Sequence, residues 1–183
     1  MKKVFILNGV GTSGKGAFAE FVQKYIPGFK YSIIDLPKEA AEILGWNGGK
    51  TEKDRKFLSD IMDLATEYND SPYNDVKSLV IDFYRDDIDL KVFLIDMRDP
   101  KDIARAVKDF RAETILIRNP NVDAIDSNHA DRDVENYNYD YIIENDSTLE
   151  QLEKVAKIFV HDIICENHIP DNHKPFVLTC SKY

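Results

Sequence analysis

The sequence predicts an α/β protein whose parallel sheet is covered by helices on both faces. Short apolar runs alternate along the chain with segments in which apolar residues recur every three or four positions, the period of an amphipathic helix. The short runs are mainly continuous apolar stretches and not alternations of apolar and polar residues, which is typical of strands buried on both faces. The 183 residues contain no internal repeat and no Pro/Ser-rich linker, so we expect one domain over residues 1–183.

Five strands are expected, each from an apolar run that ends at or near a polar residue. These runs are KVFILN (3–8), KYSIIDL (30–36), KVFLIDM (91–97), ETILIR (113–118) and YDYIIEN (139–145). Ligands of such sheets bind outside the carboxyl ends of the strands, so the polar residues at these ends should project toward one common rim. They are Asn8, Asp35, Asp96, Arg98, Arg118, Asn145 and Asp146.

Helices are expected between these runs, because apolar residues recur there with helical spacing. Pro27 and Gly28 end the first helix, and Thr51 with Asp54 resembles a capping box at the start of another. The expected helices cover residues 18–25, 37–44, 51–68, 71–84, 100–110 and 149–159.

The charge and composition of the chain limit its partners. The formal net charge is −9, which repels nucleic-acid backbones, so a DNA or RNA polymer is not expected as a substrate. A small phosphorylated substrate is compatible with this charge, because a local cluster of Lys and Arg can override the global sign. The first apolar run is too short for a signal peptide or a membrane span, and Cys165 and Cys180 are expected to be free thiols, so we expect a cytoplasmic protein.

The segment VFILNGVGTSGKGAFAEFV, residues 4–22, carries the most specific motif. Gly9, Gly14 and Lys15 have the spacing G-x-x-x-x-G-K between an expected strand and an expected helix. In such a loop the backbone N–H groups curl around phosphates, the helix start adds a positive dipole end, and the lysine reaches the outer phosphates. The alternative is an ordinary glycine-rich turn. The residues expected to bind the phosphates of ATP are Gly11, Thr12, Ser13, Gly14, Lys15, Gly16 and Ala17.

Gly16 departs from this motif, which normally has Ser or Thr after the lysine to bind Mg²⁺. Without that hydroxyl the metal would be held mostly by waters and by the phosphates of the nucleotide. Adenylate kinases also have a glycine at this position, although they have Thr where this chain has Ala17. Thr12 and Ser13 are the candidates to compensate for the missing hydroxyls.

In this order, the motifs resemble those of P-loop nucleoside monophosphate kinases, and more narrowly the phage-type deoxynucleoside monophosphate kinases and the related animal phosphomevalonate kinases. Besides the loop, the matching pieces are DLPKEAAEILGW, DRKFLSDIMDLATEY, VFLIDMRDPKDI and YDYIIENDSTLEQLEKVAKIF. The resemblance implies a three-layer αβα P-loop NTPase fold with a five-stranded parallel sheet. It also implies a helical acceptor-binding region at about 36–88, a lid at about 119–138, and the use of ATP and Mg²⁺.

The resemblance also implies roles for basic residues. Lys15 would bind the β- and γ-phosphates of ATP, and Arg98 would grip the acceptor phosphate, for which a bidentate guanidinium is suited. Lys38 and Arg55 lie on the helices that cover the acceptor in this family. The alternatives are a surface salt bridge for Arg98 and a solvated surface charge for Lys38 and Arg55.

Two carboxylates are further candidates. Asp96 follows an apolar strand and is expected to organise Mg²⁺ through water, and Asp35 is expected to orient the acceptor. Each has the alternative of capping the helix that follows it.

The polar segment 119–138 is expected to close over the donor phosphates and exclude water, as the lid of such kinases does. Arg118 and Arg132 would serve this lid, with Arg132 stabilising the phosphoryl group in transfer, and His129 would contact the substrate. The alternatives are a salt bridge of Arg132 with the acids beside it and an exposed loop histidine.

We therefore expect a kinase that transfers the γ-phosphoryl group of ATP to a small phosphorylated acceptor, with a (deoxy)nucleoside monophosphate preferred. A kinase of another phosphometabolite and an inactive nucleotide-binding protein stay open as alternatives. In the tail 166–183 and just before it, Cys165, His168, His173 and Cys180 are zinc-type ligands, but they lack the usual paired order. No pattern selects a base, a sugar or an oligomeric state, and no membrane partner is expected.

Overall fold

A computed structural model of the chain describes residues 2–86, 89–122, 134–165 and 174–182. The chain divides into two compact units. We call residues 1–30 with 88–183 the sheet unit, and residues 31–87 the helical unit. Each unit is described by itself.

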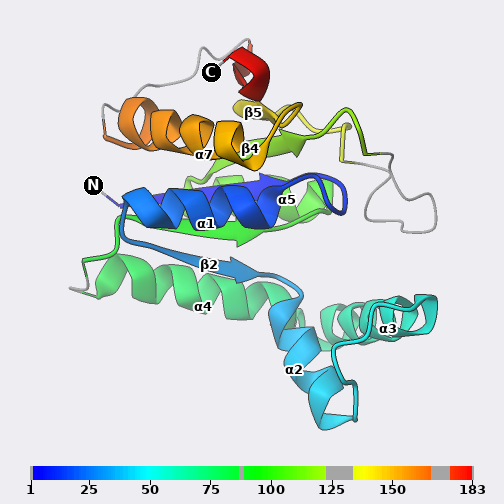
Figure 1. The fold of residues 1–183 in the computed structure, drawn as a ribbon. Coiled ribbons are helices and arrows are strands. Elements are labelled where there is room, and N and C mark those ends of the chain that lie inside the picture. The colour runs from blue at the N-terminus through cyan, green and yellow to red at the C-terminus, as the bar shows by residue number, and fades with distance from the viewer. Residues whose placement is uncertain (1, 87–88, 123–133, 166–173, 183) are drawn as a thin grey trace. The chain divides into compact units, whose positions relative to one another are not determined.

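One parallel sheet organises the sheet unit (Figure 1). Its strands are β1 (Lys3–Asn8), β2 (Gly28–Ser32), β3 (Val92–Asp96), β4 (Glu113–Arg118), β5 (Tyr141–Glu144) and β6 (Phe176–Thr179), in the spatial order β2-β3-β1-β4-β5-β6. β1 pairs in parallel with β3 on one side and with β4 on the other. The strand order therefore reverses at β1, with β3 and β2 on one side and β4, β5 and β6 on the other. Ligands of parallel sheets bind at such a reversal, which is called a switch point.

Helices cover both faces of this sheet. α1 (Lys15–Tyr25) and α7 (Leu149–Ile158) pack against each other and share a core cluster with Phe5 and Leu7 of β1. Side chains alternate across a strand, so Val4 and Ile6 face the other side, where α5 (Pro100–Phe110) contacts β1 and β4. This is the three-layer α/β/α fold that the sequence predicts.

Aromatic side chains fill the layer under α1 and α7. The ring of Phe159 lies edge-on to the rings of Phe5, Phe18 and Tyr141, with centroids 5.3, 5.5 and 5.5 Å apart. Such edge-to-face pairs add to the stabilisation from burial. Phe159 opens a π-helical turn, Phe159–Cys165, that continues directly from α7.

The sheet has six strands, whereas five were expected. The additional strand β6 lies in the tail 166–183, where no sequence pattern predicts an element, and it pairs in parallel with β5 from Tyr141↔Phe176 to Glu144↔Thr179. A short 3₁₀ turn, Cys180–Lys182, follows it. The run is only four residues long, too short for a periodic pattern to stand out.

The prediction for the second strand is also wrong in its bounds. β2 ends at Ser32, and the helix α2 (Asp35–Ile43) begins where the strand was expected to continue. Pro37 lies inside the first turn of α2, where a proline is tolerated because its missing N–H has no helical acceptor. Asp35 is therefore a helix residue and not the last residue of a strand.

The helical unit contains all of α2 together with α3 (Glu52–Asn69) and α4 (Ser71–Arg85). The predicted capping box is confirmed, since Thr51 Oγ1 accepts from Asp54 N and Asp54 Oδ2 accepts from Thr51 N at 2.9 Å. The apolar stripe of α4 is buried at Val76, Val80 and Phe83. These contacts show why the two helices form where the sequence predicts them.

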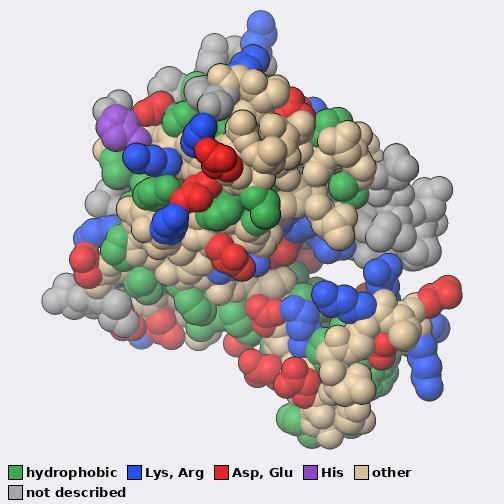
Figure 2. Space-filling model, in the orientation of Figure 1, with side chains coloured by type: hydrophobic (Ala, Val, Ile, Leu, Met, Phe, Trp, Pro, Cys, Tyr) green, Lys and Arg blue, Asp and Glu red, His purple; other side chains and the backbone are tan. Residues whose placement is uncertain are grey.

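The surface carries both signs of charge. On the face of the sheet unit that α1 and α7 cover, acidic and basic side chains are interspersed (Figure 2). Within the described ranges, none of the helices has both the length and the apolar character needed to cross a membrane.

Candidate phosphate-binding site

The loop between β1 and α1 contains residues in backbone conformations that favour glycine. Gly9 has φ +148° and Gly14 has φ +105°. A Cβ on Gly9 would lie 2.3 Å from the carbonyl oxygen of Ile117 in β4, so only glycine fits against the neighbouring strand. Thr12, with φ +63°, adds a further left-handed residue within the turn. These residues fold the loop tightly over the end of β1.

The loop leads directly into the first turn of α1. Gly14 is the N-cap and provides no side-chain cap, and the first turn of α1 contains no acidic residue. The first N–H groups of a helix have no acceptor inside the helix, and the helix dipole places partial positive charge there. The loop and helix start can therefore bind an anion such as a phosphate group.

Lys15 holds its ammonium group over this loop. Lys15 is 7% exposed, and its Nζ donates to the carbonyl oxygens of Gly9, at 2.5 Å, and Val10, at 3.0 Å. Carbonyl acceptors satisfy hydrogens of a buried ammonium without neutralising its charge. The cation is thus fixed at the loop, where the charge of a phosphate would be attracted.

The hydroxyl groups of the loop differ in their surroundings. Thr12 is exposed, and its Oγ1 donates to Gly11 O at 2.6 Å. Ser13 is 1% exposed, and its buried Oγ has no hydrogen-bond partner among the described residues. A Cβ on Gly16 would meet no atom within 4 Å, so the space beside the position of the missing motif hydroxyl is open.

Polar residues gather where the strands of the sheet unit end. Asp96, at the end of β3, is the register partner of Leu7, and Met97 N donates to Leu7 O at 3.1 Å. Arg98 follows, and its carbonyl oxygen accepts from Asn8 Nδ2 at 3.3 Å. The ends of β1 and β3 therefore lie at one rim together with the loop, and the roles of Asp96 and Arg98 there stay predictions. The N-cap of α5 is Asp99 and not Asp96.

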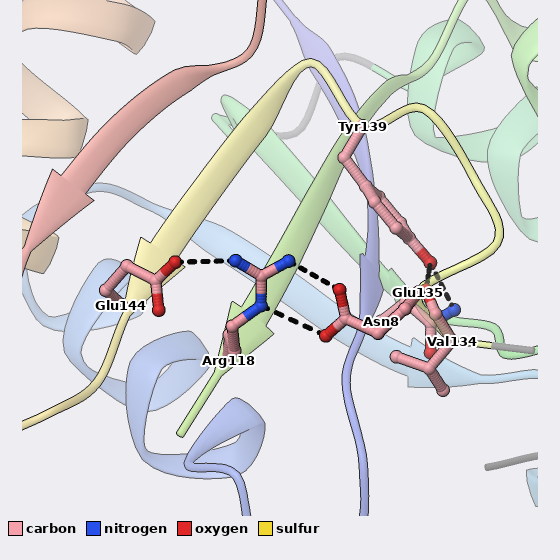
Figure 3. Close-up of polar contacts among 6 residues, drawn as sticks. All are labelled: Asn8, Arg118, Val134, Glu135, Tyr139 and Glu144. Atoms are coloured by element: carbon pink, nitrogen blue, oxygen red, sulfur yellow. Dashed lines mark hydrogen bonds and ion pairs between the residues drawn. The ribbon is translucent and has the colours of Figure 1, made fainter. Parts of the chain in front are cut away.

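Asn8 connects this rim to the segment after residue 133. Asn8 is fully buried, its Oδ1 accepts from Gly9 N at 2.7 Å, and its Nδ2 donates to Tyr139 Oη at 2.7 Å. Tyr139 Oη in turn donates to Val134 O at 2.8 Å (Figure 3). Burial raises the pKa of Tyr139, so the phenol stays protonated and keeps donating. From the sequence, Asn8 is expected only as a rim residue, and no sequence pattern predicts its contact with Tyr139.

Arg118 is held by two carboxylates. Its Nη1 donates to Glu144 Oε1 at 2.7 Å, its Nε donates to Glu135 Oε1 at 3.0 Å, and its Nη2 also contacts Glu135 (Figure 3). The hydrogen bond with Glu135 is the main cause that raises the pKa of Arg118. The guanidinium thus ties β4 to β5 and to residue 135, and its role in a lid stays a prediction.

The other predicted lid residues, His129 and Arg132, lie outside the described residues, as does the segment 123–133 to which they belong. Of the predicted lid, the structure describes residues 119–122 and 134–138. His168 and His173 of the possible zinc set also lie outside the described residues, while Cys165 is an exposed and Cys180 a buried free thiol.

The predicted acceptor residues Asp35, Lys38 and Arg55 belong to the helical unit. Asp35 Oδ2 accepts from Ser32 N at 2.8 Å, and Lys38 Nζ donates to Asp35 Oδ1 at 2.7 Å. Arg55 is exposed on α3. Asp35 therefore stabilises the turn from β2 into α2, which is a local role compatible with a further contact to a ligand.

Comparisons with known proteins were made for sequence and for structure. No family model matches the sequence, and no curated protein matches it. Among solved structures, a protein of Chloroflexus aurantiacus provisionally described as a kinase is similar at a TM-score of 0.42 and 9% identity, covering 97% of this chain and 84% of that one.

Two further solved structures are similar over most of their length. A sugar kinase from Janibacter sp. has a TM-score of 0.39 and 12% identity, covering 99% of this chain and 87% of that one. A thymidylate kinase from Ehrlichia chaffeensis has a TM-score of 0.30 and 12% identity, covering 97% and 92%. At these TM-scores the similarity carries no argument about activity. The chain itself combines a parallel α/β sheet with a glycine-lysine loop between β1 and α1, at the switch point of the sheet.

Proposed function

We propose that this protein is an ATP-dependent kinase that transfers the γ-phosphoryl group to a small phosphorylated acceptor, a (deoxy)nucleoside monophosphate. The observation that carries the proposal is the buried Lys15 ammonium, which two loop carbonyls hold at the start of α1. A glycine-lysine loop in this position between a strand and a helix is suited to the phosphates of a nucleotide.

The chemistry of phosphoryl transfer matches what the rim offers. This reaction needs the donor and acceptor phosphates in line and their developing charge neutralised, with little covalent participation by the protein. Lys15 would neutralise the outer phosphates of the donor. Arg98 lies two residues beyond the end of β3, next to β1, and would bind the acceptor phosphate through its guanidinium.

The residues present fit a loosely held Mg²⁺. The described residues contain no group of three His, Cys, Asp or Glu side chains that could enclose a metal ion. Asp96 is half-buried at the end of β3 and would hold Mg²⁺ through a water molecule. Mg²⁺ commonly keeps several waters and binds through one or two carboxylates and the phosphates of the substrate, so this sparse set suffices.

Replacing Arg98 with alanine is expected to raise the KM for the acceptor by roughly 10- to 100-fold, the loss of one charged hydrogen-bonding partner. The KM for ATP should change little, because the loop that would bind ATP is intact. Steady-state kinetics with each substrate varied in turn measure both constants. Arg105→Ala, an exposed arginine of α5, is the control. A rise in the KM for ATP alone would contradict the acceptor role of Arg98.

Replacing Gly16 with serine is expected to lower the Mg²⁺ concentration needed for half-maximal activity. The position has open space for the side chain, and a hydroxyl there is the usual Mg²⁺ ligand of the motif. Gly16→Ala adds the same carbon without the hydroxyl and should leave the Mg²⁺ requirement unchanged. Equal effects of both substitutions would show that the hydroxyl does not reach the metal.

One observation favours a second candidate function. Gly16 and Ala17 carry no hydroxyl, which would suit a nucleotide-binding protein without catalysis. Calorimetric titration with ADP should detect binding in both cases, whereas release of ADP from ATP in the presence of a nucleoside monophosphate is expected only for the kinase. Binding without release for any tested acceptor would favour the second candidate, and no binding would reject both.

A further inference from the structure

Asn145, the residue after β5, contacts the phosphate-binding loop. Asn145 is 7% exposed, its backbone N donates to Arg118 O at 2.7 Å, and its Nδ2 donates to Ser13 O at 2.9 Å. A Cβ on Gly14 would lie 2.5 Å from Nδ2, so the amide packs directly against the loop. Asn145 is thus fixed by β4 and in turn holds the carbonyl of Ser13.

This hydrogen bond orients the next peptide group. The peptide bond between Ser13 and Gly14 is trans, so the carbonyl oxygen of Ser13 and the N–H of Gly14 point in opposite directions. When Asn145 holds the oxygen, the Gly14 N–H is directed away from Asn145. The Gly14 N–H belongs to the start of α1, where the backbone would meet a phosphate.

The chain end holds the neighbour of Asn145. Ser181 N donates to Asp146 Oδ1 at 2.9 Å, and Ser181 Oγ donates to Asp146 Oδ2 at 2.6 Å. These hydrogen bonds lower the pKa of Asp146, so the carboxylate stays charged and keeps accepting. Cys180 is fully buried, with Sγ 4.0 Å from Asn145 Oδ1. The pairing of β6 with β5 brings these residues to the loop.

We propose that Asn145 is a positioning residue for the phosphate-binding loop, and that the C-terminal segment 174–182 holds it in place through Asp146. Asn145 acts on a nucleotide through the Gly14 N–H and not by direct contact. Residues 174–182 are then part of the site, although they lie more than 150 residues from the loop in sequence. The expected effect of Asn145 on kinetics rests on the proposed kinase function, whereas its expected effect on the conformation of the loop does not.

The first test uses the nucleotide-free protein. Amide hydrogen exchange across residues 10–16 should be faster in Asn145→Ala than in the wild type, while exchange in β4 and α5 stays unchanged. Ser181→Ala should give a smaller increase in the same residues, and Ser78→Ala, an exposed serine of α4, should give none. Unchanged exchange across residues 10–16 in the folded Asn145→Ala protein would overturn the proposal. A uniform increase over the whole sheet unit would also overturn it, because that indicates a general loss of stability.

The second test measures the nucleotide. Calorimetry with ADP should show a Kd raised roughly 5- to 30-fold by Asn145→Ala and roughly two- to fivefold by Ser181→Ala, in line with losing one hydrogen bond and leaving an acceptor unpaired. The KM for the acceptor should stay constant. If Asn145→Ala does not fold, Ser181→Ala and Asp146→Asn decide the question. If the wild type binds no ADP, the proposed function fails, and the exchange result still decides the role of Asn145.

Discussion

Replacing Lys15 with alanine is expected to abolish most phosphoryl transfer, with kcat lowered by roughly 10²- to 10³-fold or more. The substitution removes a positive charge that is buried at the loop, where the dielectric is low and charge on a transferring phosphoryl group would be stabilised strongly. ATP binding should weaken as well. Single-turnover kinetics separate the two effects, because they report the chemical step at saturating ATP.

Lys24→Ala is the matched control, because Lys24 lies on the same helix and its side chain is largely exposed in an ion pair with Glu153. Turnover of this variant should equal that of the wild type, since exposed ion pairs contribute little. Far-ultraviolet circular dichroism should show that the Lys15→Ala protein is folded. Undiminished turnover of a folded Lys15→Ala protein would remove Lys15 from the mechanism.

Replacing Gly9 with alanine is expected to destabilise the whole sheet unit. The added Cβ would collide with the carbonyl oxygen of Ile117 at 2.3 Å, and φ of +148° is unfavourable for any residue with a side chain. Backbone strain and overpacking together predict a loss of about 2–5 kcal/mol in the free energy of unfolding. Thermal denaturation should show a Tm lowered by roughly 5–15 °C.

Gly16→Ala is the control for this effect, because the added Cβ would meet no atom and the position is helical. Its Tm should equal or slightly exceed that of the wild type, since alanine favours a helix over glycine by about 1 kcal/mol. Equal Tm changes for the two substitutions would contradict the close approach of Gly9 to β4.

Much of the fold could be predicted because its signals are local. Each predicted strand is recognised from an apolar run of a few residues, and each predicted helix from apolar residues that recur within a few turns. This applies to the strands β1, β3, β4 and β5 and to the helices α1, α3, α4, α5 and α7. The capping box at Thr51 needs only residues three positions apart. The parallel arrangement then follows from runs that are apolar on both faces.

Other elements depend on contacts that no local pattern contains. β6 has only four residues and becomes a strand because β5 offers it an edge. The apolar run 30–36 resembles a strand over its whole length, but Asp35 accepts from Ser32 N and the chain turns there into α2. The turn is fixed by one side chain, so hydrophobicity could not place it.

The site divides in the same way. Gly9, Gly14 and Lys15 form one contiguous motif, and their geometry agrees with the spacing. Asn145, by contrast, meets Ser13 across 132 positions, and Tyr139 meets Asn8 across 131. The sequence could place Asn8 and Asn145 at the rim, because Asn8 ends β1 and Asn145 follows β5, but it could not predict their partners. The hydrogen bonds that support the loop come from tertiary packing.

The transfer of ³²P from [γ-³²P]ATP to a nucleoside monophosphate tests the central claim most directly. The assay uses the whole protein with Mg²⁺ and, separately, each ribo- and deoxyribonucleoside monophosphate, with phosphorylated non-nucleotide acceptors as a comparison set. We expect labelled nucleoside diphosphate from at least one acceptor with the wild type, and almost none with Lys15→Ala. Label on a non-nucleotide acceptor alone would contradict the proposed acceptor class, and no labelled product from any acceptor, with ADP still bound, would contradict the kinase activity itself.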